Sequence, residues 1–232
     1  MGDLILEARG VRKQFFRKGR SSARNFDAVA DVDLQLERGK LVELTGRSGS
    51  GKSTLLNVMA GLLAPTEGSV LLEGQSLYDL DDQKLSRLRN ARFGVVPQGQ
   101  TALPTLSVVQ NVMLPYCMYR ADDGVEGRAI QLLDRLGIGE LIDAYPDELS
   151  GGEMRRMAIA RALICKPDVL FADEPTGDLD DDNTRAVLQV VRDITDEGAA
   201  VLLVTHEQVA AEYADCVLRM DAGRIEAETE IA

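Results

Sequence analysis

The octet G-R-S-G-S-G-K-S, residues 46–53, constrains this chain more than any other stretch. It fits the pattern G-x-x-x-x-G-K-[S/T], whose glycines let the backbone curl until several N–H groups converge on one phosphate. The apolar run Leu41–Thr45 precedes the octet as a predicted strand, and the periodic segment Lys52–Leu63 follows it as a predicted helix. A glycine loop between a strand and the amino end of a helix is the context in which this pattern binds nucleotide phosphates.

Two side chains of the loop carry separate tasks. Lys52 supplies a compact cation for the β- and γ-phosphate oxygens, and the Ser53 hydroxyl is a candidate ligand for Mg²⁺. The alternative, a glycine turn with a solvated lysine, is disfavoured by the flanking strand and helix. We therefore predict that ATP and Mg²⁺ bind here. The residues expected to line the nucleotide are Gly46, Arg47, Ser48, Gly49, Ser50, Gly51, Lys52, Ser53 and Thr54.

A second apolar run, V-L-F-A-D-E-P at residues 169–175, ends in two carboxylates. Alone this signal is weak, since many strands end in an acidic residue at the surface. Beside the glycine loop it predicts that Asp173 holds Mg²⁺ through its water shell and that Glu174 polarises the attacking water. Because positioning and charge neutralisation do most of the work in phosphoryl transfer, loss of Glu174 is expected to reduce hydrolysis far more than binding.

Two further polar residues follow predicted strands. His206 comes after the buried run V-L-L-V-T, and Gln98 comes after R-F-G-V-V-P. Ligands of α/β sheets bind at the carboxyl ends of strands. His206 is therefore a candidate sensor of the γ-phosphate, and Gln98 is a candidate contact for Mg²⁺ or the attacking water. A structural histidine and a plain surface glutamine stay open as alternatives.

A serine and two glycines, Ser150, Gly151 and Gly152, stand directly before the predicted helix Gly152–Cys165. The ordinary interpretation is a turn that caps the helix. Free N–H groups and the Ser150 hydroxyl also make a fitting seat for an anion. The residues alone leave both interpretations open. An anion-binding site here would be far along the chain from the glycine loop 46–53.

Short apolar runs that alternate with helical segments predict an α/β fold with a parallel sheet covered on both faces. Leu4–Val11 and Val29–Leu36 alternate in the manner of half-buried antiparallel strands, which predicts an N-terminal antiparallel β subdomain. The polar, basic segment 12–24 between them is expected to be a solvated loop.

The segment 98–149 contains helical patterns and no predicted strand, which indicates an inserted α-helical subdomain. We expect a single domain over residues 1–232. Its core and β subdomain comprise 1–97 and 150–232.

Composition and charge exclude several classes of protein. The formal net charge of -12 argues against broad binding to nucleic acid, so no nucleic-acid partner is expected. The chain has three cysteines, none in a C-x-x-C pair, and one histidine, which makes a zinc site or a disulfide scaffold improbable. No apolar run approaches the roughly 18 residues of a membrane span, so a membrane role is expected to require a partner.

The order of these motifs resembles the nucleotide-binding domain of ATP-binding cassette (ABC) transporters over essentially the whole chain. This resemblance implies a P-loop, RecA-like core, an ATPase activity and a dimer. By motif, it assigns residues 46–53 as Walker A, Gln98 as the Q-loop, Leu149–Glu153 as the signature, Val169–Glu174 as Walker B, Thr176–Asp180 as the D-loop and His206 as the H-loop.

The family implies a reason for the second anion seat. Two such domains lie head to tail as a homodimer or a pseudo-symmetric heterodimer, and the serine and glycines of one close on the γ-phosphate held by the other. Asp180 would communicate between the two sites. Phe15 matches the aromatic that stacks on adenine, with Phe16 as the alternative. Glu153 stands where glutamine is more usual, and Asp178 stands where a neutral residue is frequent.

Within the family, the sequence resembles the group of lipoprotein-releasing, macrolide-exporting and cell-division cassettes. Members of this group pair with an integral membrane permease at the cytoplasmic face of the membrane and often convey force across it. The segment 98–119 would form the groove for the permease, with Met113, Pro115, Tyr116 and Met118 as its apolar surface or simply as subdomain packing. The alternatives are a soluble cassette ATPase that works on DNA or ribosomes and a catalytically inactive scaffold.

Overall fold

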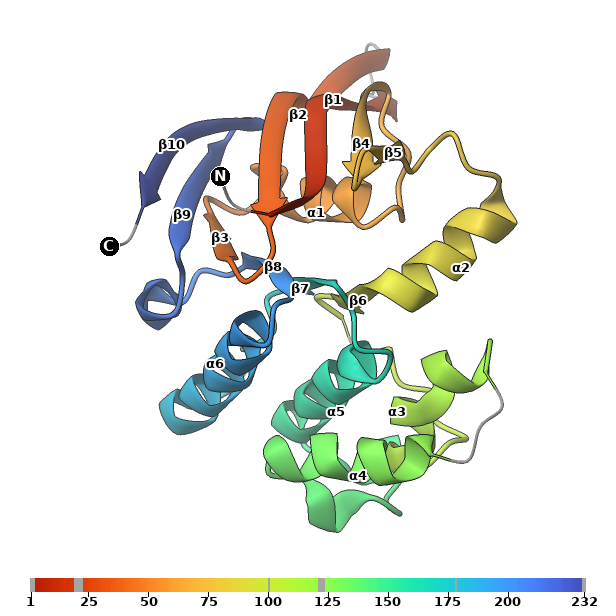
Figure 1. Ribbon diagram of the computed structural model, residues 1–232. Helices are drawn as coiled ribbons and strands as arrows, with labels where there is room; N and C mark the ends of the chain where they lie inside the picture. The colour runs from red at the N-terminus through yellow and green to blue at the C-terminus, as the bar shows by residue number, and fades with distance from the viewer. Residues whose placement is uncertain (1–2, 19–22, 100, 121–123, 178, 231–232) are drawn as a thin grey trace.

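The computed structural model describes residues 3–18, 23–99, 101–120, 124–177 and 179–230. Its elements form successive layers, as Figure 1 shows. A four-stranded sheet lies above α1, a six-stranded sheet lies below α1, and the remaining large helices other than α2 lie on the far face of the six-stranded sheet.

The two sheets differ in how their strands run. The four-stranded sheet is antiparallel, in the order β2-β1-β4-β5, and the six-stranded sheet has the order β10-β9-β3-β8-β7-β6. In the latter, β9, β3, β8, β7 and β6 run parallel, and β10 runs antiparallel to β9. The strands are β1 (Leu4–Lys18), β2 (Ala23–Glu37), β3 (Leu41–Thr45), β4 (Glu67–Leu72), β5 (Gln75–Ser76), β6 (Phe93–Val96), β7 (Val169–Asp173), β8 (Ala200–Val204), β9 (Cys216–Asp221) and β10 (Arg224–Glu230).

Helices lie between successive parallel strands, and three of them, α3, α4 and α5, lie between β6 and β7. In Figure 1, α3, α4 and α5 gather as one group away from the four-stranded sheet, with α6 beside them. The helices are α1 (Lys52–Met59), α2 (Asp82–Arg92), α3 (Val108–Cys117), α4 (Val125–Arg135), α5 (Gly151–Leu163) and α6 (Asp181–Asp196), with 3₁₀ turns η1 (Gly139–Leu141), η2 (Pro146–Glu148) and η3 (Gln208–Glu212).

The central strands are buried on both faces. In β7, Val169 and Phe171 join the apolar cluster that contains α1, whereas Leu170 and Ala172 join the cluster that contains α3 to α6. Successive side chains of a strand point to opposite faces, so a strand between two cores needs a continuous apolar run. The runs read from the sequence as buried strands are confirmed for this reason.

The prediction of a solvated loop over 12–24 is wrong for the described residues, because β1 and β2 run through most of it. Phe15 pairs with Phe26 across the two strands. Arg12 donates from Nε and Nη2 to the two carboxylate oxygens of Asp27, at 3.0 and 2.9 Å. Aromatic and oppositely charged cross-strand pairs stabilise exposed strands, so a polar composition does not by itself mark a loop.

The helix predicted over Lys52–Leu63 ends earlier, at Met59. Gly61 adopts a φ of 67°, which a helix interior does not allow. The N–H groups of the two residues after Gly61 both donate to the carbonyl of Asn57, at 2.9 and 3.1 Å. Bonds of this kind satisfy the last carbonyls of a helix while turning the chain away from it.

Helix α2 was not predicted from the sequence. Among its residues only Leu85 is buried, so it lacks the apolar period that marks an amphipathic helix. Its amino end is fixed instead by Asp81, whose carboxylate accepts from the N–H of Lys84 at 2.8 Å.

The carboxyl group of Glu43 lies inside the six-stranded sheet and has no ionic partner in the part of the chain that the structure describes. Glu43 of β3 stands in register with Leu203 of β8 and Val217 of β9 and is only 2% exposed. Its Oε2 has no hydrogen-bond partner among the described residues. Burial raises the pKa of Glu43 from 4.5 to about 7.

Glu43 should make folding stability depend on pH. Between its unfolded value of 4.5 and about 7 the folded state keeps a proton that the unfolded chain has lost, so stability falls as pH rises through this window. We expect Glu43→Gln to remove this loss and to raise the free energy of unfolding by about 3 kcal/mol near pH 8, with little effect near pH 4. Urea unfolding at both pH values measures the difference. An identical pH dependence in parent and variant would contradict the assignment.

Candidate functional site

The glycine loop 46–53 connects β3 to α1, and at two of its glycines no side chain fits. Gly51 has a φ of 109°, and a Cβ there would lie 2.1 Å from the carbonyl oxygen of Ala28. Gly46 has a φ of 144°, and a Cβ there would lie 2.2 Å from the carbonyl oxygen of Met220. The loop is therefore confined between the backbones of β2 and β9, and glycine at these positions is a steric requirement.

The amino end of α1 is open toward an anion. Gly51 is its N-cap residue, no side chain caps it, and no acidic residue stands in its first turn. The first N–H groups of a helix have no intrahelical partner and carry a partial positive charge. Lys52 donates from Nζ to the carbonyls of Gly46 and Arg47, at 2.7 and 3.0 Å, which folds its ammonium over the loop. The loop thus offers an ammonium group and free N–H groups at one place.

Asp173 ends β7, and only β8 separates β7 from β3 in the sheet. It is 5% exposed, and its Oδ1 has no hydrogen-bond partner among the described residues. Burial raises the pKa of Asp173, while a hydrogen bond from Ser53 opposes the rise; the charge of Glu174 also raises this pKa, and that of Lys52 lowers it. A carboxylate with an open oxygen beside a hydroxyl suits a hard divalent cation.

Glu174 faces His206 at the same edge of the sheet. Nδ1 of His206 lies 2.8 Å from Oε2 of Glu174, and the histidine side chain is 69% exposed whereas that of Glu174 is 15% exposed. The polar contact with Glu174 and the charge of that carboxylate raise the pKa of the His206 imidazole. Glu174 has a φ of 52°, and its N–H donates to the carbonyl of Val204 at 2.8 Å, which holds this unusual conformation.

Gln98 follows β6, the strand next to β7, so it lies at the same edge of the sheet. Its side chain is exposed, and its backbone carbonyl accepts from Nη1 of Arg155 at 3.1 Å. The structure therefore brings together Lys52, Ser53, Asp173 and the Glu174–His206 pair. The backbone of Gln98 is bonded instead to Arg155 of α5.

Ser150 is the N-cap residue of α5, which confirms the capping interpretation. Its Oγ accepts from the N–H of Glu153 at 3.3 Å, and its N–H and hydroxyl both donate to Oε2 of Glu153, each at 2.7 Å. Gly151 is exposed, and a Cβ on Gly152 would lie 2.8 Å from Leu179. Ser150 thus bonds within α5, and Gly152 lies against Leu179 of the loop after β7. Among the described residues, neither makes a hydrogen bond to the glycine loop.

Asp180 caps the amino end of α6. Its carboxylate accepts from the N–H of Asn183 at 2.8 Å and from the Asn183 side chain at 2.9 Å. Asn183 in turn accepts from Nη1 of Arg156 on α5, at 2.9 Å. Sequence reasoning missed Asn183, although the D-x-x-N spacing at a helix start was a signal for it. Asp178 lies outside the described residues.

Phe15 lies on β1, in the four-stranded sheet. Its ring is partly exposed, with the ring of Phe26 at 5.9 Å and Nζ of Lys13 at 5.6 Å. Phe16 is more exposed than Phe15. Both rings have free surface on which a base can stack, and Phe15 is the one with recorded ring and cation neighbours.

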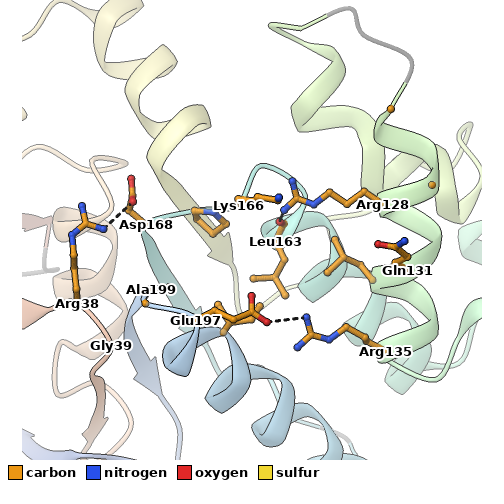
Figure 2. Close-up of a pocket in the computed structure, with 16 residues that line it drawn as sticks. Arg38, Gly39, Arg128, Gln131, Arg135, Leu163, Lys166, Asp168, Glu197 and Ala199 are labelled. Atoms are coloured by element: carbon orange, nitrogen blue, oxygen red, sulfur yellow. Dashed lines mark hydrogen bonds and ion pairs between the residues drawn. The ribbon is translucent and has the colours of Figure 1, made fainter.

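A cavity of about 970 Å³ lies at the opposite edge of the six-stranded sheet, where β7 and β8 begin (Figure 2). Charged side chains line it and pair with one another: Arg38 donates to Asp168 at 3.0 Å, and Arg135 lies 3.5 Å from Glu197. The motif residues lie at the other ends of these strands. We therefore assign these ion pairs a structural role and not one in phosphate chemistry: Arg38 with Asp168 joins the chain before β3 to the start of β7, and Arg135 with Glu197 joins α4 to the end of α6.

The fold and the phosphate seat together define a P-loop nucleotide-binding protein. Residues 29–177 match the family model described as ABC transporter. The chain is 39% identical over 225 residues to the lipoprotein-releasing system ATP-binding protein LolD of Aquifex aeolicus, covering 97% of each chain. It is 36% identical to the macrolide export ATP-binding/permease protein MacB of Bdellovibrio bacteriovorus, covering 98% of this chain and 34% of that protein.

A solved structure of an ATP-binding cassette also matches the fold of this chain. The dimeric ATP-binding cassette MJ0796, in a post-hydrolysis state bound to ADP and Pi, matches with a TM-score of 0.92 and 32% identity, covering 98% of this chain and 99% of that chain. The chain therefore belongs to the ABC transporter family. It is an ATP-binding subunit that hydrolyses ATP for transport, and the predicted α/β P-loop fold with an antiparallel β subdomain is confirmed. Within the described residues, no helix is both long and apolar enough to cross a membrane.

The contact between Glu174 and the chain's single histidine gives a direct test of this geometry. The carboxylate stabilises the protonated imidazolium, so the pKa of His206 lies above its ordinary value of 6.5. In Glu174→Gln we expect this pKa to fall back toward 6.5. Proton NMR titration of the imidazole measures it without ambiguity of assignment.

Glu207 provides the matched control for this titration. Its Oε1 lies 3.8 Å from Nε2 of His206, so Glu207→Gln should lower the histidine pKa less than Glu174→Gln. Equal pKa values in the parent and in Glu174→Gln would show that the contact is absent in solution.

Proposed function

We propose that this chain powers a membrane permease of the lipoprotein-releasing and macrolide-exporting group, in which ATP-driven closure of two cassettes conveys force to the permease. The resemblance to LolD over nearly all of both chains, and to the ATP-binding part of MacB, supports this assignment. The observation that carries it is the convergence of a phosphate seat, an open carboxylate and a carboxylate–imidazole pair at one edge of a parallel sheet.

ATP binding falls to the glycine loop in this proposal. Residues 46–54 wrap the β- and γ-phosphates with their N–H groups, and Lys52 adds its charge. Phe15 stacks on the adenine through its exposed ring face. Lys52 already sits over the loop, so the ammonium exchanges backbone carbonyls for phosphate oxygens when the nucleotide binds.

The residues present also fit Mg²⁺. Ser53 and Asp173 would hold the ion, with Gln98 as a further contact, because the buried Oδ1 of Asp173 has no hydrogen-bond partner within the described part of the chain and Ser53 already bonds to Asp173. Bound there, the ion would neutralise charge on the phosphate oxygens. A hard cation would also favour the ionised Asp173, against the burial that raises its pKa.

Hydrolysis depends on Glu174 and His206. The Glu174 carboxylate accepts a hydrogen bond from the attacking water and so directs its lone pair toward the γ-phosphorus. His206, mostly exposed and paired with Glu174, holds that carboxylate in place and can donate to a γ-phosphate oxygen. The close pairing of the two side chains keeps them aligned before the nucleotide arrives, which lowers the cost of ordering them in the transition state.

Ser150, Gly151 and Gly152 act on a second molecule in this proposal. In a head-to-tail homodimer their hydroxyl and N–H groups would close on the γ-phosphate held by the partner's glycine loop, and Asp180 would lie at the seam. The exposure of Ser150 and Gly151, and partners that belong to α5 and the loop after β7, support a surface seat. The related cassette MJ0796 is dimeric in its structure with ADP and Pi.

The permease would dock on an apolar groove formed by α2, α3 and α5. A cavity of about 240 Å³ lies there, with Pro115, Met118 and Tyr119 among its lining residues. Met118 is 63% exposed and Tyr119 is also exposed, whereas Met113 and Tyr116 pack partly buried against the helical cluster. The first group therefore suits a partner, and the second group suits packing.

The division of the chain follows from these roles. We propose that residues 98–149 form the helical subdomain of a single domain, which is held to the cytoplasmic face of the membrane by the permease. No nucleic-acid partner is expected for so acidic a chain.

Glu174→Gln tests the proposal. Gln keeps the shape of the side chain but does not polarise water as a carboxylate does, so we expect phosphate release to fall by at least about 100-fold while ATP binding persists. ATP then stays in place, and the variant should form a stable dimer with ATP and Mg²⁺. Light scattering and phosphate release measure the two effects. A variant that stays monomeric at saturating ATP and Mg²⁺ would contradict the shared site.

Glu153 provides a finer test of the second anion seat. Its carboxylate takes both donors of Ser150 and places a negative charge where a γ-phosphate would approach. In the Glu174→Gln background we expect Glu153→Gln to lower the ATP concentration needed for dimerisation several-fold. Ser150→Ala should raise it.

Glu148→Gln is the matched control, since Glu148 makes the same kind of bond to the N–H of Tyr145, at 2.7 Å, without touching Ser150. It should leave dimerisation unchanged. Equal shifts for Glu153→Gln and Glu148→Gln would indicate a general charge effect instead of competition at the seat.

A further inference from the structure

The ladder between β6 and β7 ends just before the proposed catalytic groups. Its last registered pair is Val96 with Ala172. Beyond this pair the chain after β6 leaves the sheet as a loop that carries Gln98. Backbone carbonyls past the end of a ladder need other partners, from water or from side chains.

Arg155 of α5 supplies such partners. Its Nη1 donates to the carbonyl of Pro97 at 3.3 Å and to the carbonyl of Gln98 at 3.1 Å. Arg155 stands about one turn after Ser150, so these bonds join the loop after β6 to the beginning of α5.

The other side of the same guanidinium faces the loop after β7. A Cβ built on Gly177 would lie 3.5 Å from Nη2 of Arg155. Gly177 follows Glu174 closely, and its N–H donates to the Glu174 carbonyl at 3.3 Å. Arg155 therefore lies between the two loops that continue β6 and β7. The planar, forked guanidinium suits this place because its donors point in several directions, whereas an ammonium is a single point.

Packing leaves a gap between α5 and the part of the loop after β6 that carries Gln98. A cavity of about 150 Å³ lies between this loop and α5, with Gln98, Gly99 and Thr101 on one side and Gly151 and Met154 on the other. Further along the loop, Arg161 of α5 donates from Nη1 to the carbonyl of Thr101 at 2.8 Å. Two arginines of α5 thus bond to the backbone of the loop beside this cavity.

We propose that Arg155 is a positioning residue for ATP hydrolysis. By holding the carbonyls of Pro97 and Gln98 beside the loop after β7, it fixes where Gln98 stands relative to Glu174. It does so from α5, so it also fixes both loops relative to Ser150. The inference rests on the proposed function insofar as Gln98 and Glu174 act on the bound nucleotide.

The effect of losing Arg155 follows from what it does not touch. Within the described residues its side-chain hydrogen bonds go to Pro97 and Gln98 and not to the glycine loop, and its charge is the weakest of the influences on the pKa of Asp173, so nucleotide affinity should persist. Displacement of a positioned group by about 1 Å costs up to roughly 100-fold in rate. We expect Arg155→Gln to lower kcat about tenfold, with KM and the Kd for ATP within about twofold of the parent.

The experiment compares three variants of the full chain in steady-state ATPase assays, nucleotide titrations and thermal unfolding. Arg155→Lys should recover part of the lost kcat, because an ammonium can reach one of the two carbonyls. Arg128→Gln is the matched control. Like Arg155, Arg128 donates to a backbone carbonyl outside its own helix: it reaches from α4 to Leu163 at 3.0 Å, at the end of α5 away from Ser150. It should keep kcat within about twofold of the parent even if its Tm falls.

Two results would overturn the inference: a kcat for Arg155→Gln within twofold of the parent, or equal losses of kcat in Arg155→Gln and Arg128→Gln that follow their Tm values. Normal ATP binding shows that a variant is folded. If Arg155→Gln does not fold, Arg155→Lys decides the question by the same comparison of kcat with KM. The proposed function is tested separately, by the ATP dependence of dimerisation in Ser150→Ala. The role of Arg155 is tested by the kcat of its variants relative to the parent, so the two can fail independently.

Discussion

The parallel backbone ladder β3-β8-β7-β6 is the constraint on which the rest of this structure depends. In a parallel sheet the carboxyl ends of all strands lie on the same side, so the residues that follow different strands become neighbours although they are far apart in sequence. The glycine loop leaves β3, Asp173 ends β7, His206 follows β8 and Gln98 follows β6. The chemistry of the site is therefore a consequence of strand order, and the apolar runs that fill both cores are what secure that order.

Sequence patterns predicted those parts of the fold whose residues are buried on a regular period. The run Leu41–Thr45 and the run ending at Asp173 were legible as strands because both faces of each meet apolar cores. The segment 12–24 was not, because its strands are held by cross-strand pairs such as Arg12 with Asp27, which leave no apolar alternation. Helix α2 was not predicted for a related reason: it is fixed by its cap at Asp81 and has almost no buried face.

The candidate site divides in the same way. Contiguous motifs such as residues 46–53 were predictable because each residue's task follows from its neighbours in sequence. The sequence predicted only that Glu174 and His206 both follow the carboxyl ends of strands. Their close contact became known from the structure. Arg155 was not predictable, because its partners are backbone carbonyls that any residue would present. Long-range bonds from a side chain to the backbone leave no pattern in a single sequence.

Helix α5 bonds to several parts of the site. Ser150 is its N-cap residue, with both donors engaged by Glu153. Within the next turn Arg155 reaches the loop after β6, and Arg156 reaches Asn183, which holds Asp180 at the start of α6. The loop after β6 and the start of α6 are thus bonded to adjacent turns of the helix that Ser150 caps. The position of α5 therefore fixes the surroundings of Ser150, Gln98 and Asp180 together.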